Sequence, residues 1–138
     1  MNAPATRLHL LDSRTLAALM QQPQGPIARR IEQIGENQVA TSLIVACELR
    51  HAVARQGSLR LAERLEELLA VLPVLPLEPD TDRHYALIRH ALERAGQSAE
   101  STELLLAAHA RGLDAVLVCA QPERYAAIPA LTALSWLD

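Results

Sequence analysis

Short apolar runs alternate with longer stretches of helical period along this chain of 138 residues. Five of the runs have strand character, at residues 8–12, 37–41, 74–77, 115–118 and 133–137. The stretches between them repeat apolar residues at helix spacing, as Leu61, Leu65 and Leu68 do. Parallel strands joined by helices need crossover connections, which cover both faces of the sheet. The sequence therefore predicts an α/β fold in one domain, with a short, mainly parallel central sheet between two helical layers.

Helix boundaries follow from residues that cap or break helices. We expect helices at residues 15–22, 27–34, 42–56, 58–72, 81–95 and 101–111. Glycines stand directly after four of these patterns, at positions 35, 57, 96 and 112. The short break at Gly57 and Ser58 predicts that the two helices around it fold back on each other as a hairpin.

Three carboxylates lie inside apolar runs, where a charged side chain needs a partner. They are Asp12 in LHLLDSRTLAAL, Glu48 in SLIVACELRHAV and Glu103 in ESTELLLAAHA. A carboxylate taken out of water without a partner costs several kcal/mol or gives up its charge. Parallel sheets bind ligands beyond the carboxyl ends of their strands, and Asp12 falls at one of those ends. We expect the three acids to converge around a shared cation.

Each of these acids also has a structural explanation. Asp12 can cap the helix that begins after it, a role that Ser13 also performs well. Glu48 shares a helix face with Ile44 at the rim of the core, where a neighbouring Arg can pair with it. Glu103 lies in the first turn of its helix, where the macrodipole stabilises a negative side chain by roughly 0.3–1 kcal/mol. Residue patterns alone leave both roles open.

Other functional classes are disfavoured by the sequence. Cys47 and Cys119 form no CxxC motif and have no His at zinc-ligand spacing, so we expect both to be small buried hydrophobic residues. His109 completes no metal or nucleophile constellation, and we expect it to be a hydrogen-bonded core histidine. No apolar run reaches the ~18 residues of a membrane span, and the N-terminus lacks a secretory pattern. These features predict a cytoplasmic protein.

The net charge of −3 conceals an asymmetry along the chain. Residues 1–64 carry eight Arg and five acids (+3), whereas residues 65–138 carry five Arg and eleven acids (−6). Arg50, Arg55 and Arg60 cluster on and after the helix of Glu48, where they are candidates for contacting a phosphate backbone. A solvated helix face explains the same pattern equally well.

The order and spacing of these segments resemble the PIN domain, most closely the VapC-type toxins of bacterial toxin–antitoxin pairs. The resemblance runs nearly end to end. Its most specific part is VATSLIVACELR, from Val39 to Arg50, in which the helix of Glu48 opens after a strand and Thr-Ser. The resemblance implies a PIN-like three-layer α/β/α sandwich.

The same resemblance implies metal-dependent cleavage of RNA. Asp12, Glu48 and Glu103 would then be the catalytic residues and the ligands of Mg²⁺ or Mn²⁺, which prefer oxygen donors. Ser13, Thr102 and Glu100 are auxiliary candidates at the same pocket. The resemblance further implies a cognate antitoxin, RNA as substrate or ligand, and a homodimer.

Two departures from the family pattern bear on this activity. Where the family usually carries Thr-Asn after the first acid, this chain has Ser13 and Arg14, whose guanidinium would compete with a metal for Asp12. After the fourth strand a polar ligand position of the family is Ala120. The sequence therefore supports two hypotheses. One is a VapC-like endoribonuclease toxin, active or weakened. The other is a catalytically inactive PIN-domain homologue that binds an antitoxin or RNA.

Overall fold

A five-stranded sheet forms the centre of the computed structural model, which describes residues 7–137 of the chain. The strand order is β3-β2-β1-β4-β5, and every neighbouring pair is parallel. The strands are β1 (His9–Leu11), β2 (Val39–Ser42), β3 (Val74–Leu75), β4 (Val116–Val118) and β5 (Thr132–Leu134). The predicted α/β class and parallel sheet are confirmed.

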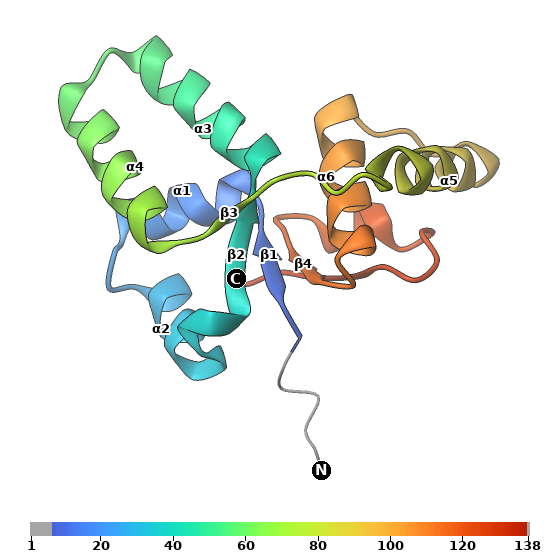
Figure 1. The fold of residues 1–138 in the computed structure, drawn as a ribbon, viewed down its shortest axis with the longest axis horizontal. Coiled ribbons are helices and arrows are strands. Elements are labelled where there is room, and N and C mark those ends of the chain that lie inside the picture. Colours follow the sequence, from blue (N-terminus) through green and yellow to red (C-terminus); the bar gives the residue numbers. More distant parts are fainter. Residues whose placement is uncertain (1–6, 138) are drawn as a thin grey trace.

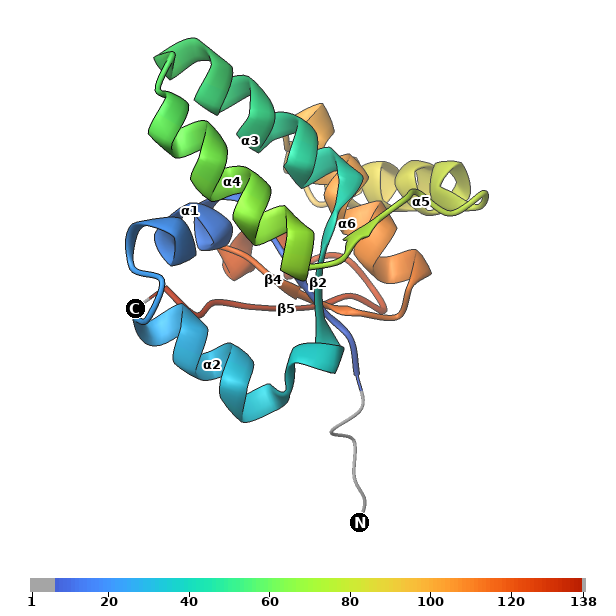
Figure 2. The same ribbon diagram turned by 60° about the vertical axis from the view of Figure 1, so that its left-hand side comes forward.

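Helices cover both faces of this sheet. They are α1 (Ser13–Gln21), α2 (Pro26–Ile34), α3 (Leu43–Gln56), α4 (Leu59–Val71), α5 (Thr81–Arg94) and α6 (Ser101–Gly112), with short 3-10 turns η2 (Glu36–Gln38) and η3 (Pro122–Tyr125). Figure 1 shows α1 to α4 on one side of the sheet and α5 and α6 on the other. In Figure 2, α3 and α4 run side by side as the predicted hairpin. The three-layer arrangement is confirmed.

The strand register brings the carboxyl ends of three strands to one edge. Leu11, the last residue of β1, stands opposite Thr41 of β2 and Val118 of β4. The N–H of Asp12 continues this pairing and donates to the carbonyl of Val118 at 2.9 Å. The segments that leave β1, β2 and β4 therefore start close together.

The core is apolar on both faces of the sheet, as a parallel sheet between helices requires. The side chains of Leu10, Leu11, Leu117 and Val118 are fully buried. Helices contribute Leu16, Val45, Leu65, Ile88 and Ala107 from both layers to the same cluster. The register of the strands is fixed, because a slip of one residue would move every side chain of a strand to the opposite face of the sheet.

Several elements are shorter than the sequence predicted. The strand expected from residue 37 begins at Val39, because residues 36–38 form the turn η2. β3 ends at Leu75 before Pro76, which has no N–H for a ladder hydrogen bond. Instead of extending β5, Trp136 is buried and its ring stacks on His9, with centroids 5.8 Å apart.

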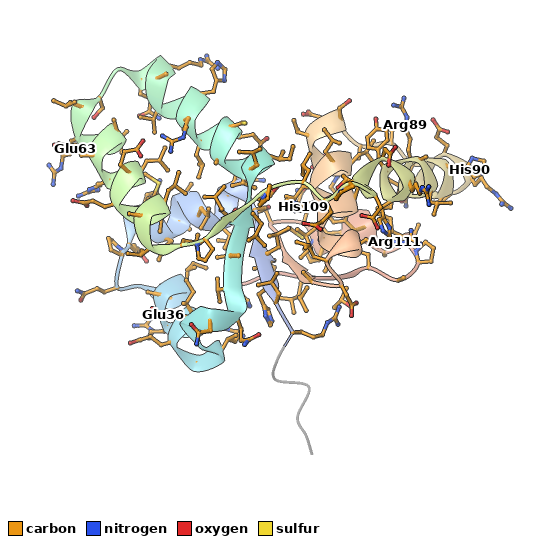
Figure 3. All side chains as sticks on the ribbon, in the orientation of Figure 1. Glu36, Glu63, Arg89, His90, His109 and Arg111 are labelled. Carbon is orange, nitrogen blue, oxygen red and sulfur yellow. The ribbon has the colours of Figure 1, made fainter. Side chains whose placement is uncertain are left out.

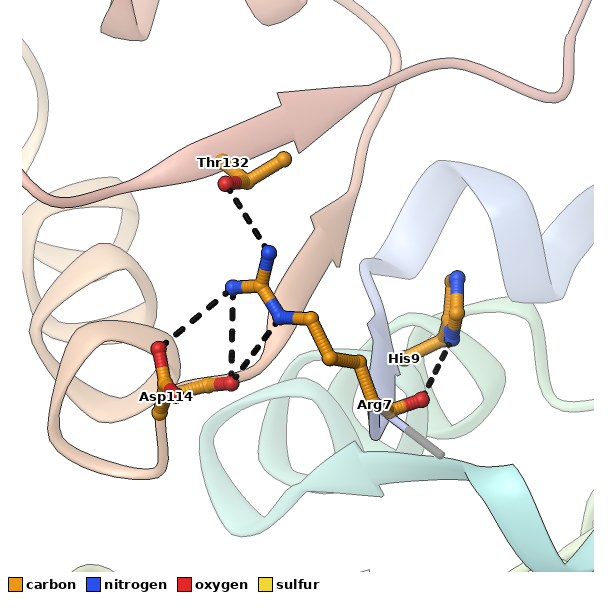
Figure 4. A network of polar contacts seen from close by, with 4 residues as sticks. All are labelled: Arg7, His9, Asp114 and Thr132. Carbon is orange, nitrogen blue, oxygen red and sulfur yellow. Dashed lines mark hydrogen bonds and ion pairs between the residues drawn. The ribbon is translucent and has the colours of Figure 1, made fainter. Parts of the chain in front are cut away.

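A polar cluster at the opposite edge joins the amino ends of three strands (Figure 4). The Arg7 guanidinium, just before β1, donates to the carbonyl of Asp114 and to Oγ1 of Thr132, the latter at 3.2 Å. The carbonyl of Arg7 also lies 3.0 Å from Nδ1 of His9. These groups are exposed, so their net contribution to stability is modest, but they link β1 to the segments that begin β4 and β5.

The prediction that both cysteines are buried is confirmed for one of them and wrong for the other. Cys119 is buried, as predicted, whereas the prediction for Cys47 is wrong because it lies on the exposed side of α3, one turn after the exposed Leu43. Within residues 7–137, none of the helices has the length and apolar character to cross a membrane. The cytoplasmic location and the one-domain organisation stay predictions.

The fold predicts where truncation of a leucine is costly. Leu117→Ala, in the buried strand β4, should lower the free energy of unfolding by about 2–5 kcal/mol, because it removes packed methyl groups and leaves a cavity. Leu59→Ala is the matched control, since Leu59 is 77% exposed, and should change it by less than about 0.5 kcal/mol. Urea unfolding of the two variants measures the difference. Equal losses would contradict the described core.

Candidate active site

Asp12 lies directly after β1 and caps α1. Its Oδ1 accepts a hydrogen bond from the N–H of Thr15 at 2.9 Å, and its Oδ2 accepts one from the N–H of Ala120 at 3.1 Å. The carboxylate is thus held between the start of α1 and the segment after β4. Each carboxylate oxygen has two lone-pair sites, so the structural role of Asp12 leaves capacity to bind a cation.

Glu48 reaches the same edge from α3. It is half-buried, as the predicted position at the core rim requires, and its Oε1 accepts a hydrogen bond from the Ser13 hydroxyl at 2.5 Å. The start of α3 is set by Ser42, whose Oγ accepts from the N–H of Ile44 at 3.1 Å. Because Ser42 is also the last residue of β2, the sheet determines where Glu48 lies.

Glu103 comes from the first turn of α6, and both of its oxygens have partners. Oε1 accepts from the N–H of Glu100 at 3.1 Å, which satisfies one of the free donors at the helix start. Oε2 accepts from the Arg124 guanidinium at 2.8 Å. Arg124, in η3, was not among the residues predicted from the sequence. Nothing in its segment marked it, because only the fold brings η3 beside α6.

The predicted catalytic and auxiliary residues share one cavity of about 190 Å³. Its lining includes Asp12, Ser13, Glu48, Glu100, Thr102 and Glu103. A second cavity of about 80 Å³ is also lined by Asp12 and Glu103, and Ala120 and Arg124 line it as well. The structure therefore brings together side chains from α1, α3 and α6 that are far apart in the sequence.

The acids give this region a negative potential that acts on its neighbours. Burial, followed by the charge of Asp12, raises the pKa of the Cys119 thiol to about 12. Burial together with the charge of Glu103 also raises the pKa of the Tyr125 phenol. Both groups line a cavity of the site and stay protonated at neutral pH. Neither is therefore a candidate nucleophile.

The donor set suits a hard divalent cation, since carboxylate and hydroxyl oxygens are the ligands that Mg²⁺ and Mn²⁺ prefer. Yet among residues 7–137 no three His, Cys, Asp or Glu side chains lie close enough to hold one ion. In this arrangement Ser13 holds Glu48 and Arg124 holds Glu103. A shared cation would therefore require these side chains to move closer together.

Arg14 and Ala120, the two departures from the family pattern, both lie near Asp12, but only Ala120 has a described hydrogen bond to it. Arg14 lines both cavities and is exposed, but among the described contacts no hydrogen bond or ion pair joins it to Asp12. Ala120 reaches Asp12 only through its backbone N–H. Among the described contacts, the guanidinium that pairs with one of the three acids is that of Arg124, which contacts Glu103. Competition between Arg14 and a metal stays a prediction.

The candidate phosphate-contacting residues lie away from these cavities, on the α3–α4 hairpin. Arg50 forms an ion pair with Glu66 of α4, which satisfies its guanidinium within the protein. Arg55 and Arg60 are exposed on either side of the turn at Gly57. A role in binding RNA stays a prediction for all three.

His109 lies beneath the site and connects its helices. The side chain is fully buried on α6, and Nδ1 lies 2.8 Å from Oγ of Ser42, the residue that caps α3. Figure 3 shows His109 at the sheet, whereas His90 lies far out on α5. The predicted core position is confirmed, although Nε2 has no partner among the described residues. His109 therefore helps to set α3, with Glu48, against α6, with Glu103.

Comparison with known proteins identifies the family. A sequence model of the PIN domain matches residues 10–131. The chain belongs to the PIN domain family. PIN domains are generally nucleases and typically use divalent metal ions. No curated protein matches this sequence.

Several solved structures with the same fold are VapBC complexes. VapBC2 from Rickettsia felis, bound to a promoter DNA fragment, matches with a TM-score of 0.85 and 23% identity over 94% of this chain and 98% of that chain. VapBC-1 from nontypeable Haemophilus influenzae matches with a TM-score of 0.81 and 25% identity over 95% and 99%, respectively. DNA-bound VapBC from Salmonella typhimurium matches with a TM-score of 0.83 and 22% identity over 94% and 98%. The PIN domain described here therefore resembles the VapC type.

Two histidines make the stability of this PIN domain depend on pH: His109 is fully buried and His9 is partly buried. Burial lowers the pKa of His109, and of His9, below the ordinary value of 6.5. Below that pH the unfolded chain binds more protons than the folded one, so the free energy of unfolding should fall as the pH drops. Urea unfolding at about pH 7.5 and pH 5.5 measures this loss.

Two variants test whether His109 causes the loss of unfolding free energy at low pH. His109→Gln should show a smaller loss on acidification than the wild-type protein, with His9 contributing the remainder. His90→Gln, at an exposed position of α5, should behave as the wild type does. An unchanged pH dependence in His109→Gln would contradict the buried, neutral state of His109.

Proposed function

We propose that this PIN domain is a VapC-like, metal-dependent endoribonuclease toxin, active or weakened. The observation that carries the proposal is the cavity at the carboxyl edge of the parallel sheet, which collects Asp12, Glu48 and Glu103 with Ser13, Thr102 and Glu100. Their donor atoms match the chemistry of a divalent-metal nuclease. Membership of a family whose members are generally nucleases supports the same conclusion.

In this proposal Asp12, Glu48 and Glu103 would hold Mg²⁺ or Mn²⁺. When bound, such an ion supplies an activated water and positive charge beside the scissile phosphate. Asp12 is preorganised, because two backbone N–H groups fix its carboxylate. Once Glu48 binds a cation, the Ser13 hydroxyl that now donates to it can donate to a phosphate oxygen or water instead. Thr102 and Glu100 line the rim and would assist.

RNA is the proposed substrate, and the exposed arginines of the hairpin are its proposed contacts. Arg55 and Arg60 are exposed and would neutralise backbone phosphates. Arg50 would have to leave Glu66 before it could do the same. Arg55 and Arg60 are therefore the better candidates of the three.

A specific observation favours a second candidate function, an inactive homologue that binds an antitoxin or RNA. Each of the three acids already has an internal partner, and no three side chains among residues 7–137 are arranged to share an ion. Ala120 adds no side-chain ligand to the second cavity. A protein that keeps the acids for stability alone would look the same.

An antitoxin is the proposed partner, and a groove on the α1–α4 side suits it. This groove has a volume of about 700 Å³, and apolar residues from α1, α2 and α4 line it together with the charged residues Arg29, Glu32 and Glu36. The apolar lining includes Leu19, Ala28, Ile31, Leu68, Val71 and Leu72. Apolar grooves between helices accept the apolar face of an amphipathic helix. The VapBC structures of similar fold contain toxin–antitoxin pairs, which supports this partner, and we propose a homodimer as the assembly.

The nuclease proposal predicts the effect of removing one ligand charge. Purified wild-type protein should cleave RNA with Mn²⁺ or Mg²⁺ and stop in excess chelator. Asp12→Asn should abolish cleavage, because the amide keeps the shape but loses the charge that holds the ion. Asp82→Asn is the matched control, since Asp82 is exposed in the first turn of α5, and should retain full activity.

Once a contaminating ribonuclease has been excluded, cleavage that persists in chelator and in Asp12→Asn would contradict this mechanism. A wild-type protein that is inactive with either metal, yet binds an antitoxin or RNA, would establish the second candidate function.

The groove proposal predicts which surface an antitoxin needs. Ala28→Arg places a charge in the apolar groove and should weaken capture of an antitoxin encoded beside this gene by roughly tenfold or more. Ala54→Arg, on the exposed side of α3, introduces the same side chain elsewhere and should bind normally. Light scattering of the free protein checks the homodimer. Equal binding by both variants would place the interface outside the groove.

A further inference from the structure

An arginine of the chain itself lines the second cavity, together with Asp12 and Glu103. The Arg124 guanidinium, from η3, donates to Oε2 of Glu103 at 2.8 Å, while Oε1 accepts from the N–H of Glu100 at 3.1 Å. Both carboxylate oxygens of Glu103 therefore have partners. In the chain, α6 comes before β4 and η3 comes after it. The contact between Arg124 and Glu103 therefore spans the carboxyl end of β4.

The fold holds Arg124 in this position. Tyr125, the next residue, is buried to 6% exposure and lines both cavities, which anchors η3 against the site. The N–H of Arg124 donates to the carbonyl of Gln121 at 3.1 Å, which closes the turn. A guanidinium keeps its charge at every physiological pH, so its positive charge is a permanent part of the metal-free site.

Glu103 differs from the other two acids in the charge of its partner. Asp12 is held by backbone N–H groups and Glu48 by the Ser13 hydroxyl, and these neutral donors leave lone pairs for a cation. Glu103 is paired with a full positive charge. A carboxylate oxygen can serve two partners, but a guanidinium and a divalent cation that share Glu103 would repel each other.

We propose that Arg124 is an internal counterion of Glu103, so that a divalent cation that binds Glu103 has to compete with its guanidinium. The inference rests on the ligand set of the proposed function. The side chains of Arg124 and Glu103 are 40% and 29% exposed, and pairs at such exposure are weak enough to exchange. The ion pair therefore lowers the affinity for metal without closing the site permanently.

Calorimetric titration with Mn²⁺ alone tests the inference. Arg124→Gln should bind Mn²⁺ about fivefold more tightly than the wild type, the factor expected when a partly exposed ion pair no longer has to be broken. Arg14→Gln is the matched control, because Arg14 and Arg124 both line the second cavity, and this change removes the same charge without removing a described ion pair. It should change the affinity by less than about twofold. Equal gains in both variants would overturn the inference, since net charge alone would then explain them.

A second measurement needs no metal. In excess chelator, urea unfolding of Arg124→Gln, Glu103→Gln and the double variant should show non-additive effects, because either single change removes the same pair. Additive effects would overturn the inference, and so would the absence of Mn²⁺ binding in Arg124→Gln. Neither measurement reads RNA cleavage. A protein that never cleaves RNA but gives the expected results would refute the proposed nuclease and leave the inference standing.

Discussion

The parallel pairing of β1 with β2 and β4 is the constraint on which the rest of the structure depends. It aligns Leu11 with Thr41 and Val118, so three strands end at one edge of the sheet. A parallel connection must cross back over the sheet before the next strand begins, and α1, α3 and the segment with η3 therefore all start at this edge. Asp12 caps the first of those segments, Glu48 lies in the second turn of α3, and Arg124 lies in η3. The acidic cavity is thus a consequence of strand order, before any side-chain chemistry is considered.

The internal partners of the acids reconcile stability with a metal-binding role. Half-buried carboxylates are costly unless hydrogen bonds or charges compensate them, and the protein supplies backbone donors to Asp12, a hydroxyl to Glu48 and a guanidinium to Glu103. The neutral partners stabilise the metal-free protein while leaving lone pairs accessible. The guanidinium of Arg124 stabilises Glu103 through its charge, and under the proposal it would compete with a metal for that side chain. The affinity of the proposed site for metal would then depend on these internal partners as well as on the acids.

Much of the site could be predicted from the sequence, because each acid interrupts an apolar run and so stands out against its neighbours. Asp12, Glu48 and Glu103 line one cavity, as expected from that pattern and from the family resemblance. Arg124 could not be predicted, since a charged residue in a polar turn carries no local signal. The expectation for Cys47 failed for a related reason. An apolar run on a helix does not reveal which of its residues faces solvent until the neighbouring helices are in place.

The sequence by itself determined the element order, the parallel sheet and the family, because apolar periodicity and helix-capping residues act over a few neighbouring positions and are written directly in the chain. It also determined which carboxylates are unusual. Tertiary structure alone decided which groups meet them, since the pairs Ser13–Glu48 and Glu103–Arg124 join segments separated by 35 and 21 positions. Such contacts depend on helix phase and on the packing of α3 and α6 across the sheet edge. The physical reason is range: local patterns specify where the chain turns, whereas the charge beside a carboxylate is set by whatever the completed fold places within a few ångströms of it.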